Sequence, residues 1–273
     1  AFQTNGFQVG TASTVNQNTI TMVAWQWKCN GGTATATVSE SGNNPAATVQ
    51  ANTDAGFSIV TYTGTGAVGT VPHGLGAAPD LIHLKKRTGE GWVSYWNVLG
   101  ITGEDGFLGL NSNGAFADSA GEWNDTVPTS SVFTVGTQDR VNTNDGVYMA
   151  YCFKSIQGYS KIGSYVGNGQ TNGAHIYTGF KPAFLLIKGT AGSNNREWFV
   201  FDGTRDPTNP FAKYVKAEAN DAEASSVFGD LLSNGFKVRS DGASYNSSGE
   251  TFVYMAFAEH PFVSSKGAPV TAR

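Results

Sequence analysis

The sequence has little charge, only two cysteines and no long apolar run, and each shortage argues against a class of protein. Charged residues make up 14% of the 273 residues and the net charge at pH 7 is −4, so a surface that tracks nucleic-acid phosphates is not expected. Cys29 and Cys152 cannot make a zinc site alone, and a disulfide between them is the alternative use. No apolar run approaches the ~20 residues of a membrane-spanning helix. We therefore expect no nucleic-acid partner and no membrane insertion.

Catalytic motifs are also missing from the sequence. It contains no Gly-x-Ser-x-Gly elbow, no phosphate-binding loop and no dinucleotide fingerprint. No acidic pair recurs at a spacing that would indicate a glycosidase, and the 4 histidines are scattered along the chain. We expect no catalytic residues, no bound cofactor and no metal centre, and a polysaccharide-degrading enzyme is the least favoured alternative.

The residues that are abundant favour short strands joined by turns. The chain contains 35 glycines and 40% hydrophobic residues, and Phe57–Tyr62 alternates between apolar and polar positions, as a half-buried strand does. Further strands are predicted at 79–85 and 182–188, the first with His83 on its exposed face. One helix of a turn or two is predicted within Phe211–Phe228, where alanines and charges have helical spacing.

The sequence also repeats itself around Val147–Gly169. The first part of this stretch matches Thr21–Lys28 and Phe252–Glu259, and its second part matches Gly56–Gly66. A repeat of this length indicates a duplicated domain or half-domain, with Val147–Gly169 as the seam between two modules. The predicted boundaries are a closing strand pair of a preceding module at 1–30, a polar connector at 31–55, modules at 56–157 and 158–262, and a C-terminal tail at 263–273. The parent protein is accordingly expected to be longer.

Two loops combine residue types that could contact a ligand. Trp123 beside Asn124 and Asp125 would suit stacking on a sugar ring, although Trp123 could instead cap the sheet core. The loop that follows residue 201 offers carboxylate and amide oxygens for sugar hydroxyls or Ca²⁺, although turn formation and a pairing of its arginine with a neighbouring aspartate would explain the same residues. The candidate ligand-contact residues are Trp123, Asn124, Asp125, Asp202, Arg205, Asp206 and Asn209.

Several stretches resemble a known family. They include GFSIVTYTGTG (56–66), VPHGLGAAPDLIHLKKR (71–87), YMAYCFKSIQGYSKIGSYVGNG (148–169), YTGFKPAFLLIK (177–188) and ETFVYMAFAEHPF (250–262). Together with VPTSSVFTVG (127–136) and LLSNGFKVRS (231–240), they are similar to the repeated β-rich module of virion proteins of marine tailed phages, usually described as tail-fibre-like. The loops at 100–125 and 190–197 match no motif of that module.

The resemblance implies a structural or receptor-binding role on a phage particle, and the family supplies no catalytic residues to carry over. We expect an all-β fold, a lectin-like β-sandwich of two homologous modules in a pseudo-two-fold arrangement. The favoured function is a fibre component of the virion surface, assembled in the host cytoplasm, that contacts a host surface glycan or receptor. The alternative is a purely structural or decoration protein, whose partners are other virion subunits, including copies of itself.

Overall fold

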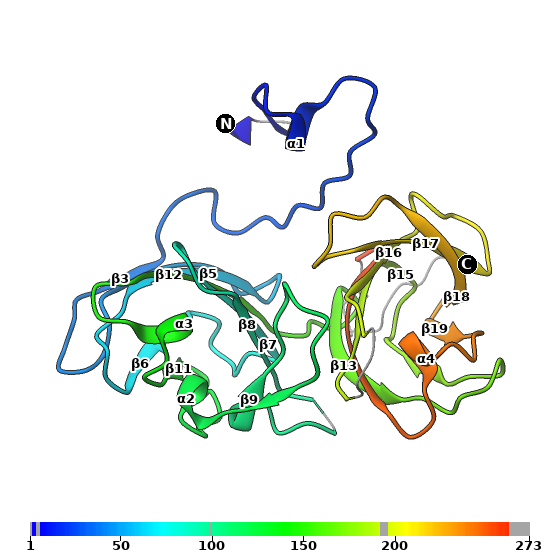
Figure 1. The fold of residues 1–273 in the computed structure, drawn as a ribbon. Helices are drawn as coiled ribbons and strands as arrows, with labels where there is room; N and C mark the ends of the chain where they lie inside the picture. The colour runs from blue at the N-terminus through cyan, green and yellow to red at the C-terminus, as the bar shows by residue number, and fades with distance from the viewer. Residues whose placement is uncertain (1, 4–5, 99, 192–195, 262–273) are drawn as a thin grey trace.

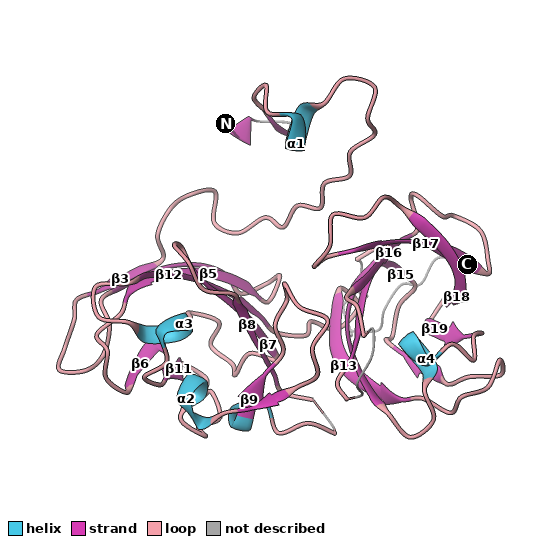
Figure 2. Cartoon of the chain, in the orientation of Figure 1, coloured by secondary structure: helices cyan, strands magenta, loops and turns pink. Residues whose placement is uncertain are grey.

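The chain folds into two β-rich halves that lie side by side (Figures 1 and 2). The computed structural model describes residues 2–3, 6–98, 100–191 and 196–261, and the predicted tail at 263–273 lies outside these ranges. We refer to residues 31–157 as the first half and to residues 158–261 as the second half. The prediction of an all-β fold is confirmed, because strands dominate both halves and the described helices have four residues or fewer. Within the described residues, no helix is long and apolar enough to cross a membrane.

A six-stranded antiparallel sheet forms the framework of the first half. Its strand order is β3-β4-β5-β12-β7-β8, and β12 pairs along its length with β5 on one side and β7 on the other. The central strand is therefore the last of the six along the chain. The bounds are β3 (Ala36–Val38), β4 (Ala47–Asn52), β5 (Phe57–Thr63), β7 (Leu81–Lys86), β8 (Trp92–Trp96) and β12 (Val147–Phe153).

An eight-stranded antiparallel sheet forms the second half and curls around its own core (Figure 1). Its order is β13-β20-β15-β16-β17-β18-β19-β14, so that β20, again the last strand, lies between β13 and β15. The bounds are β13 (Ser160–Val166), β14 (His175–Tyr177), β15 (Pro182–Gly189), β16 (Phe199–Asp202), β17 (Phe211–Lys216), β18 (Ala224–Leu232), β19 (Gly235–Val238) and β20 (Thr251–Ala258).

Smaller elements complete each half. In the first half β6 (Gly69–Pro72) pairs with β11 (Val132–Val135), and β9 (Gly106–Phe107) pairs with β10 (Ala117–Asp118). At the N-terminus β1 (Phe2–Gln3) pairs with β2 (Gly6–Phe7). The helices are α1 (Ser13–Asn16), the 3-10 turn η1 (Gly103–Asp105), α2 (Ala120–Trp123), α3 (Asp139–Asn142) and α4 (Ala243–Asn246).

Each half contains its own hydrophobic core. In the first half, inward residues of the six-stranded sheet such as Val60 and Leu84 pack against Phe133 and Val135 of β11. In the second half the curled sheet encloses a core rich in aromatic side chains, including Phe236 of β19. Alternate strand residues point inward because successive side chains of a strand lie on opposite faces.

A third core lies between the two halves and covers the other face of both large sheets. Trp96 and Phe153 from the first half meet Trp198, Met255 and further apolar residues of the second half in one cluster. The rings of Trp96 and Trp198 are stacked with 6.0 Å between their centroids. We call this cluster the shared core. Together with the core of each half it buries both faces in the middle of each large sheet, and it joins the halves.

The shared core explains why the prediction for His83 is wrong. His83 is 6% exposed, because the sheet face that would be solvated in an isolated sheet is covered here by the second half. Its Nδ1 lies 2.7 Å from the Ser94 hydroxyl oxygen, and its ring meets those of Trp96 and Trp198 edge-on. Burial lowers the pKa of His83 to about 3, since the charged form is disfavoured in an apolar site.

Two further sequence predictions differ from the structure. The helix predicted within Phe211–Phe228 is wrong, because the chain forms β17 and β18 there and both phenylalanines are buried in the second core. Pairing and burial thus outweigh the helical preference of the alanines. The polar connector predicted at 31–55, for which a short strand at 34–38 is the alternative, contains β3 at that place and also β4, whose residues Ala47 and Val49 point into the first core.

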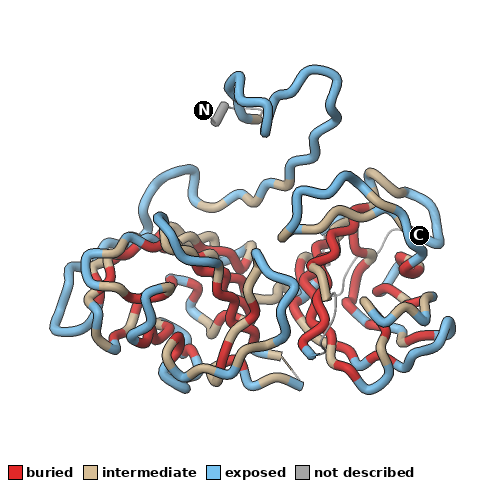
Figure 3. The backbone as a smooth tube through the Cα atoms, in the orientation of Figure 1, coloured by how far each residue is buried: buried red, intermediate tan, exposed pale blue. Residues whose placement is uncertain are grey.

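The N-terminal stretch contrasts with both halves. Figure 3 shows its backbone as largely exposed from β2 to the start of the first half. A strand is predicted at residues 19–28, but between α1 and β3 no strand is formed among the described residues. Trp25 and Trp27 nevertheless rest against the shared core, so the end of this stretch is attached to the rest of the protein.

Candidate functional site

The first candidate loop places its tryptophan inside the protein. Trp123 is the last residue of α2 and is 1% exposed. Its indole nitrogen donates a hydrogen bond of 2.9 Å to the carbonyl oxygen of Gly106, and its ring meets Tyr95 edge-on. Trp123 therefore caps the sheet core, which is the alternative that the sequence left open, and its ring is not available for stacking on a sugar.

Asn124 and Asp125 are exposed and form the turn that ends α2. Their φ angles are 54° and 46°, in the left-handed region that Asn and Asp tolerate better than most residues. The backbone nitrogen of Asn124 donates to the carbonyl oxygen of Ala120 at 2.8 Å and so closes the helix. Their residue types are explained by this backbone geometry.

The second candidate loop is held by Arg205. Its backbone nitrogen and its Nε both donate to the carboxylate of Asp202, at 2.9 and 2.5 Å. The guanidinium also donates to Glu223 at 2.7 Å and lies 5.8 Å from the ring centre of Trp25. Asp202 is 8% exposed, so this partly buried ion pair stiffens the loop and leaves few free donors or acceptors for a ligand.

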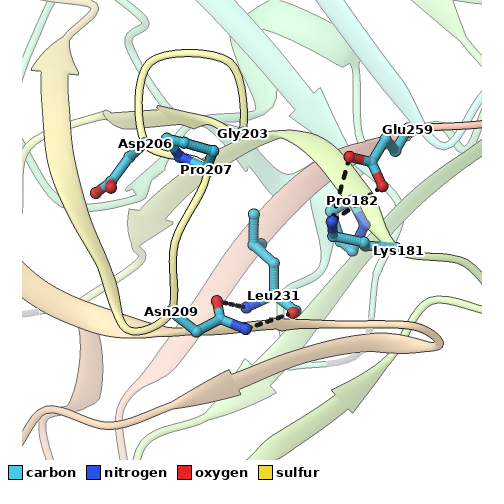
Figure 4. Close-up of a pocket in the computed structure, with 8 residues that line it drawn as sticks. All are labelled: Lys181, Pro182, Gly203, Asp206, Pro207, Asn209, Leu231 and Glu259. Atoms are coloured by element: carbon cyan, nitrogen blue, oxygen red, sulfur yellow. Dashed lines mark hydrogen bonds and ion pairs between the residues drawn. The ribbon is translucent and has the colours of Figure 1, made fainter. Parts of the chain in front are cut away.

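Asp206 and Asn209 also use their polar atoms within the protein. One carboxylate oxygen of Asp206 accepts the backbone nitrogens of Ala212 and Lys213, at 2.6 and 2.9 Å. The amide of Asn209 makes a reciprocal pair of 2.9 Å hydrogen bonds with the backbone of Leu231, as Figure 4 shows. The Asn209 side chain thereby imitates a strand partner at the end of β18.

A small pocket of about 100 Å³ lies beside this loop. In Figure 4 the carboxylate of Asp206 points away from the ion pair of Lys181 and Glu259, which borders the same pocket with an N–O distance of 3.0 Å. The volume is well below the roughly 300–1,000 Å³ of usual ligand pockets. In the described part of the chain, no cluster of three or more His, Cys, Asp or Glu side chains is arranged to hold a metal ion.

The two candidate loops are not brought together. α2 belongs to the first half, whereas the loop between β16 and β17 belongs to the second, and Figure 1 shows them on separate parts of the molecule. They therefore do not form one composite site.

A buried ionic cluster at the end of β15 was not predicted. Lys188 is 0% exposed, donates through Nζ to the carbonyl oxygen of Arg196 and lies 5.8 Å from the ring centre of Trp198. Burial lowers its pKa to about 8, against the opposing effect of Glu218 and other carboxylates. Arg196 in turn pairs with Glu250 at 2.6 Å. Lys188 is fully enclosed, so its contacts brace the end of β15 from within the protein.

A buried asparagine, Asn142, is the main polar residue that orders the first half. Its carboxamide oxygen accepts the backbone nitrogen of Thr65 at 2.9 Å, and its nitrogen donates to the carbonyl oxygens of Ala67 and Gly136, at 2.5 and 2.9 Å. It thus ties the glycine-rich turn after β5 to α3, the short helix between β11 and β12. Gly64 permits this approach, because a Cβ there would lie 2.3 Å from the carbonyl oxygen of Thr143.

The same contacts recur around Asn246 in the second half. Its carboxamide oxygen accepts the backbone nitrogen of Asn168 at 2.9 Å, and its nitrogen donates to Gln170 and Ser240. A Cβ on Gly167 would lie 2.3 Å from the carbonyl oxygen of Ser247. Both asparagines are 0% exposed, and each is the last residue of its short helix. The sequence signal was available, since each asparagine follows a buried Val or Tyr at corresponding places in the repeat.

The chain is thus an all-β protein in which Asp202, Arg205, Asp206 and Asn209 are engaged in contacts within their own half. It belongs to the family described as Domain of unknown function (DUF7483), which matches residues 1–261. No curated protein and no solved structure matches the chain.

Proposed function

We propose that the two halves are homologous modules that arose by duplication. The support is the repeated arrangement of strands, with β5-β12-β7-β8 in the first half and β13-β20-β15-β16 in the second, together with the repeated asparagine contacts. Stacked aromatic pairs recur as well, Tyr62 on Tyr148 and Tyr165 on Phe252, both with rings inclined by 12°. The lectin-like sandwich and its pseudo-two-fold arrangement remain part of this proposal.

The function that the geometry supports best is a non-enzymatic structural component of a tailed-phage virion, of the tail-fibre-like kind, that binds other virion subunits. The exposed apolar stretch at the N-terminus supports the binding of other subunits, and the assignment to a phage virion rests on the resemblance of stretches such as 56–66 and 148–169. Of the thirteen large apolar side chains that are exposed among the described residues, six lie between Phe7 and Val23. Such a concentration marks a protein-binding region, whereas the candidate ligand residues are occupied by internal contacts.

Contact with a host surface glycan or receptor is the second candidate. The pocket beside Asp206 and Asn209 supports it, because the exposed Asn209 lines the same pocket as Lys181 and Glu259, which form an ion pair. Trp123 no longer contributes to this candidate.

Immunogold electron microscopy of purified particles tests the structural function. Antibodies raised against the full chain should label particles of the virus that encodes it at a defined position. Label confined to infected-cell lysate, with none on particles, would contradict a virion role.

A glycan array probed with the full chain tests the second candidate. Binding that is lost in Asn209→Ala and kept in Asn124→Ala would place the contact at the pocket. Because Asn209 also binds Leu231, circular dichroism of each variant has to match the parent protein. Binding that neither substitution changes would contradict the pocket as the contact site.

A further inference from the structure

Residues 7–28 carry the pattern of two segments that close the cores of the halves. These segments run from β11 through α3 to β12 and from β19 through α4 to β20, and we call them closing segments. Residues 7–28 and 133–154 align without a gap, each 22 residues long. The alignment matches Phe7 with Phe133, Val9 with Val135 and Lys28 with Lys154, and the sequence VN recurs at 15–16 and 141–142.

The local structure of the N-terminal copy is the same as that of the other two. α1, α3 and α4 each have four residues and end on an asparagine. The side-chain nitrogen of each asparagine donates to the carbonyl oxygen six residues earlier, at 2.9 Å for Asn16, 2.9 Å for Asn142 and 2.7 Å for Asn246. The residue three positions later has a positive φ in each copy, at 67°, 60° and 76°.

The copies differ in burial. Phe133 and Val135 are 0% exposed, whereas Phe7 is 43% and Val9 is 39% exposed. Met22, at the position of the fully buried Tyr148, is 46% exposed. The residues that would fill a core are therefore present in the N-terminal copy without a core around them.

One face of the N-terminal copy is already docked. Trp25 and Trp27 are half-buried while Ala24 and Gln26 between them are exposed, which is the alternation of a strand with one covered face. Trp27 lies edge-on to Phe153 and Phe257 in the shared core. In β12 the matching residues, Tyr151 and Phe153, also face the shared core. The covered face of the N-terminal copy is therefore the same face that β12 turns toward the shared core.

We propose that residues 7–28 form a third closing segment and that the partner of its exposed face is a further β-module of this architecture. That module presents two strands with a vacant central place between them, and each of the two is antiparallel to residues 21–27, as β5 and β7 are to β12. Its first strand ends in an aromatic-x-Gly-x-Gly turn, because Asn142 and Asn246 both require such a turn at Gly64 and Gly167. The inference deepens the proposed function by naming the partner, and its test needs no virion, so the two can fail separately.

A second copy of the chain does not provide a vacant central strand position for residues 21–27. Between β5 and β7 the central position is filled by β12, and between β13 and β15 it is filled by β20. Both central strands are paired on both sides, so insertion of residues 21–27 would require an existing strand to leave.

A graft tests whether the N-terminal copy can close a core. Residues 133–154 of the full chain are replaced by residues 7–28, and amide exchange is followed in β5 and β7, the two strands that pair with β12. Lys28 then occupies the place of Lys154, whose Nζ lies 2.8 Å from the Asp80 carboxylate. A second graft adds Gln26→Cys, because Cys152 at that position is 0% exposed. The control graft carries the same 22 residues in shuffled order.

At least one graft of residues 7–28 should keep exchange in β5 and β7 within about ten-fold of the parent protein, and the shuffled graft should accelerate it at least about a thousand-fold. Equal exchange in the ordered and shuffled grafts would overturn the proposal.

Light scattering of the unmodified chain tests whether the partner of the segment is a second copy of the chain. A monomer is expected, and a dimer that Met22→Asp dissociates would assign the segment to a second copy and overturn the commitment to a further module.

Discussion

One sequence pattern, that of a closing segment, occurs in two structural settings, in residues 133–154 and in residues 7–28. In the first setting the short helix ends on Asn142, and a strand that is paired on both sides follows between β5 and β7. In the second the helix ends on Asn16, and residues 20–28 have no sheet partner among the described residues. The comparison separates what a local sequence can form alone from what it forms only with partners.

The helix and its turn depend on contacts only six residues apart, so they form in both settings. The strand depends on hydrogen bonds to residues far away in the chain. Tyr148 pairs with Tyr62 and Lys86, for example, and nothing equivalent surrounds Met22. Strand formation therefore reports the presence of the neighbouring strands and not only the alternating sequence.

The largest expected difference between the two settings lies in their phenylalanines. Phe133→Ala should lower the free energy of unfolding by about 3–5 kcal/mol, because it leaves a cavity in a closed core. Phe7→Ala should change it by no more than about 0.5 kcal/mol, as exposed substitutions usually do. Urea denaturation of the full chain measures both. Equal losses would show that Phe7 is packed in a core of its own.

The asparagines should show the next largest difference. Asn142→Ala and Asn246→Ala should each cost about 1–3 kcal/mol, because buried backbone groups lose their partners. Asn16 is exposed, so that Asn16→Ala should be nearly neutral in the same denaturation experiment. If Asn16→Ala lowers the free energy of unfolding as much as the other two substitutions do, a core already surrounds the N-terminal copy, contrary to this account.

At neutral pH no loss is expected where the two copies meet, at Phe153, and an effect appears there only as the pH falls. This ring lies next to both Trp27 and His83, with centroid distances of 6.3 and 6.4 Å. The pKa of His83 is about 3 in the folded protein and 6.5 in its ordinary state. As the pH falls, His83 therefore takes up a proton in the unfolded chain before it does so in the folded protein. The free energy of unfolding is highest above pH 6.5 and falls by up to about 1.4 kcal/mol per pH unit as the pH decreases toward 3.

Urea midpoints between pH 4 and 7 measure this slope. His83→Gln should flatten it, whereas His175→Gln, at an exposed residue of β14, should leave it unchanged. Parallel curves for the parent protein and His83→Gln would show that protonation of His83 does not govern the acid limit.

Local patterns predicted the all-β fold and the repeats from the sequence. Strands such as Phe57–Thr63 follow from alternation within a few residues, and the seam at Val147–Gly169 follows from direct comparison of one stretch with another. The register of the repeat was less well predicted. Sequence matching paired Val147 with Phe252, whereas the strand partners Tyr62 and Tyr165 align Tyr148 with Phe252.

The burial of particular residues could not be predicted, because it depends on which faces other elements cover. His83 alternates with apolar residues along its strand, yet the shared core encloses it. Trp123 occurs in polar surroundings along the sequence, yet α2 carries it into the first core. The internal contacts of the candidate ligand residues could not be predicted either. Asp202 and Asp206 have the composition of a binding loop, but Arg205 and the backbone of 212–213 take up their oxygens.

Hydrogen exchange of the unmodified chain, followed by mass spectrometry, tests the central comparison most directly. Peptides that cover residues 147–153 should exchange at least about a thousand-fold more slowly than peptides that cover residues 21–27, because only the former have strand partners on both sides. Equal protection of the two stretches in a monomeric chain would contradict the account, since it would mean that the N-terminal copy already has its strand partners.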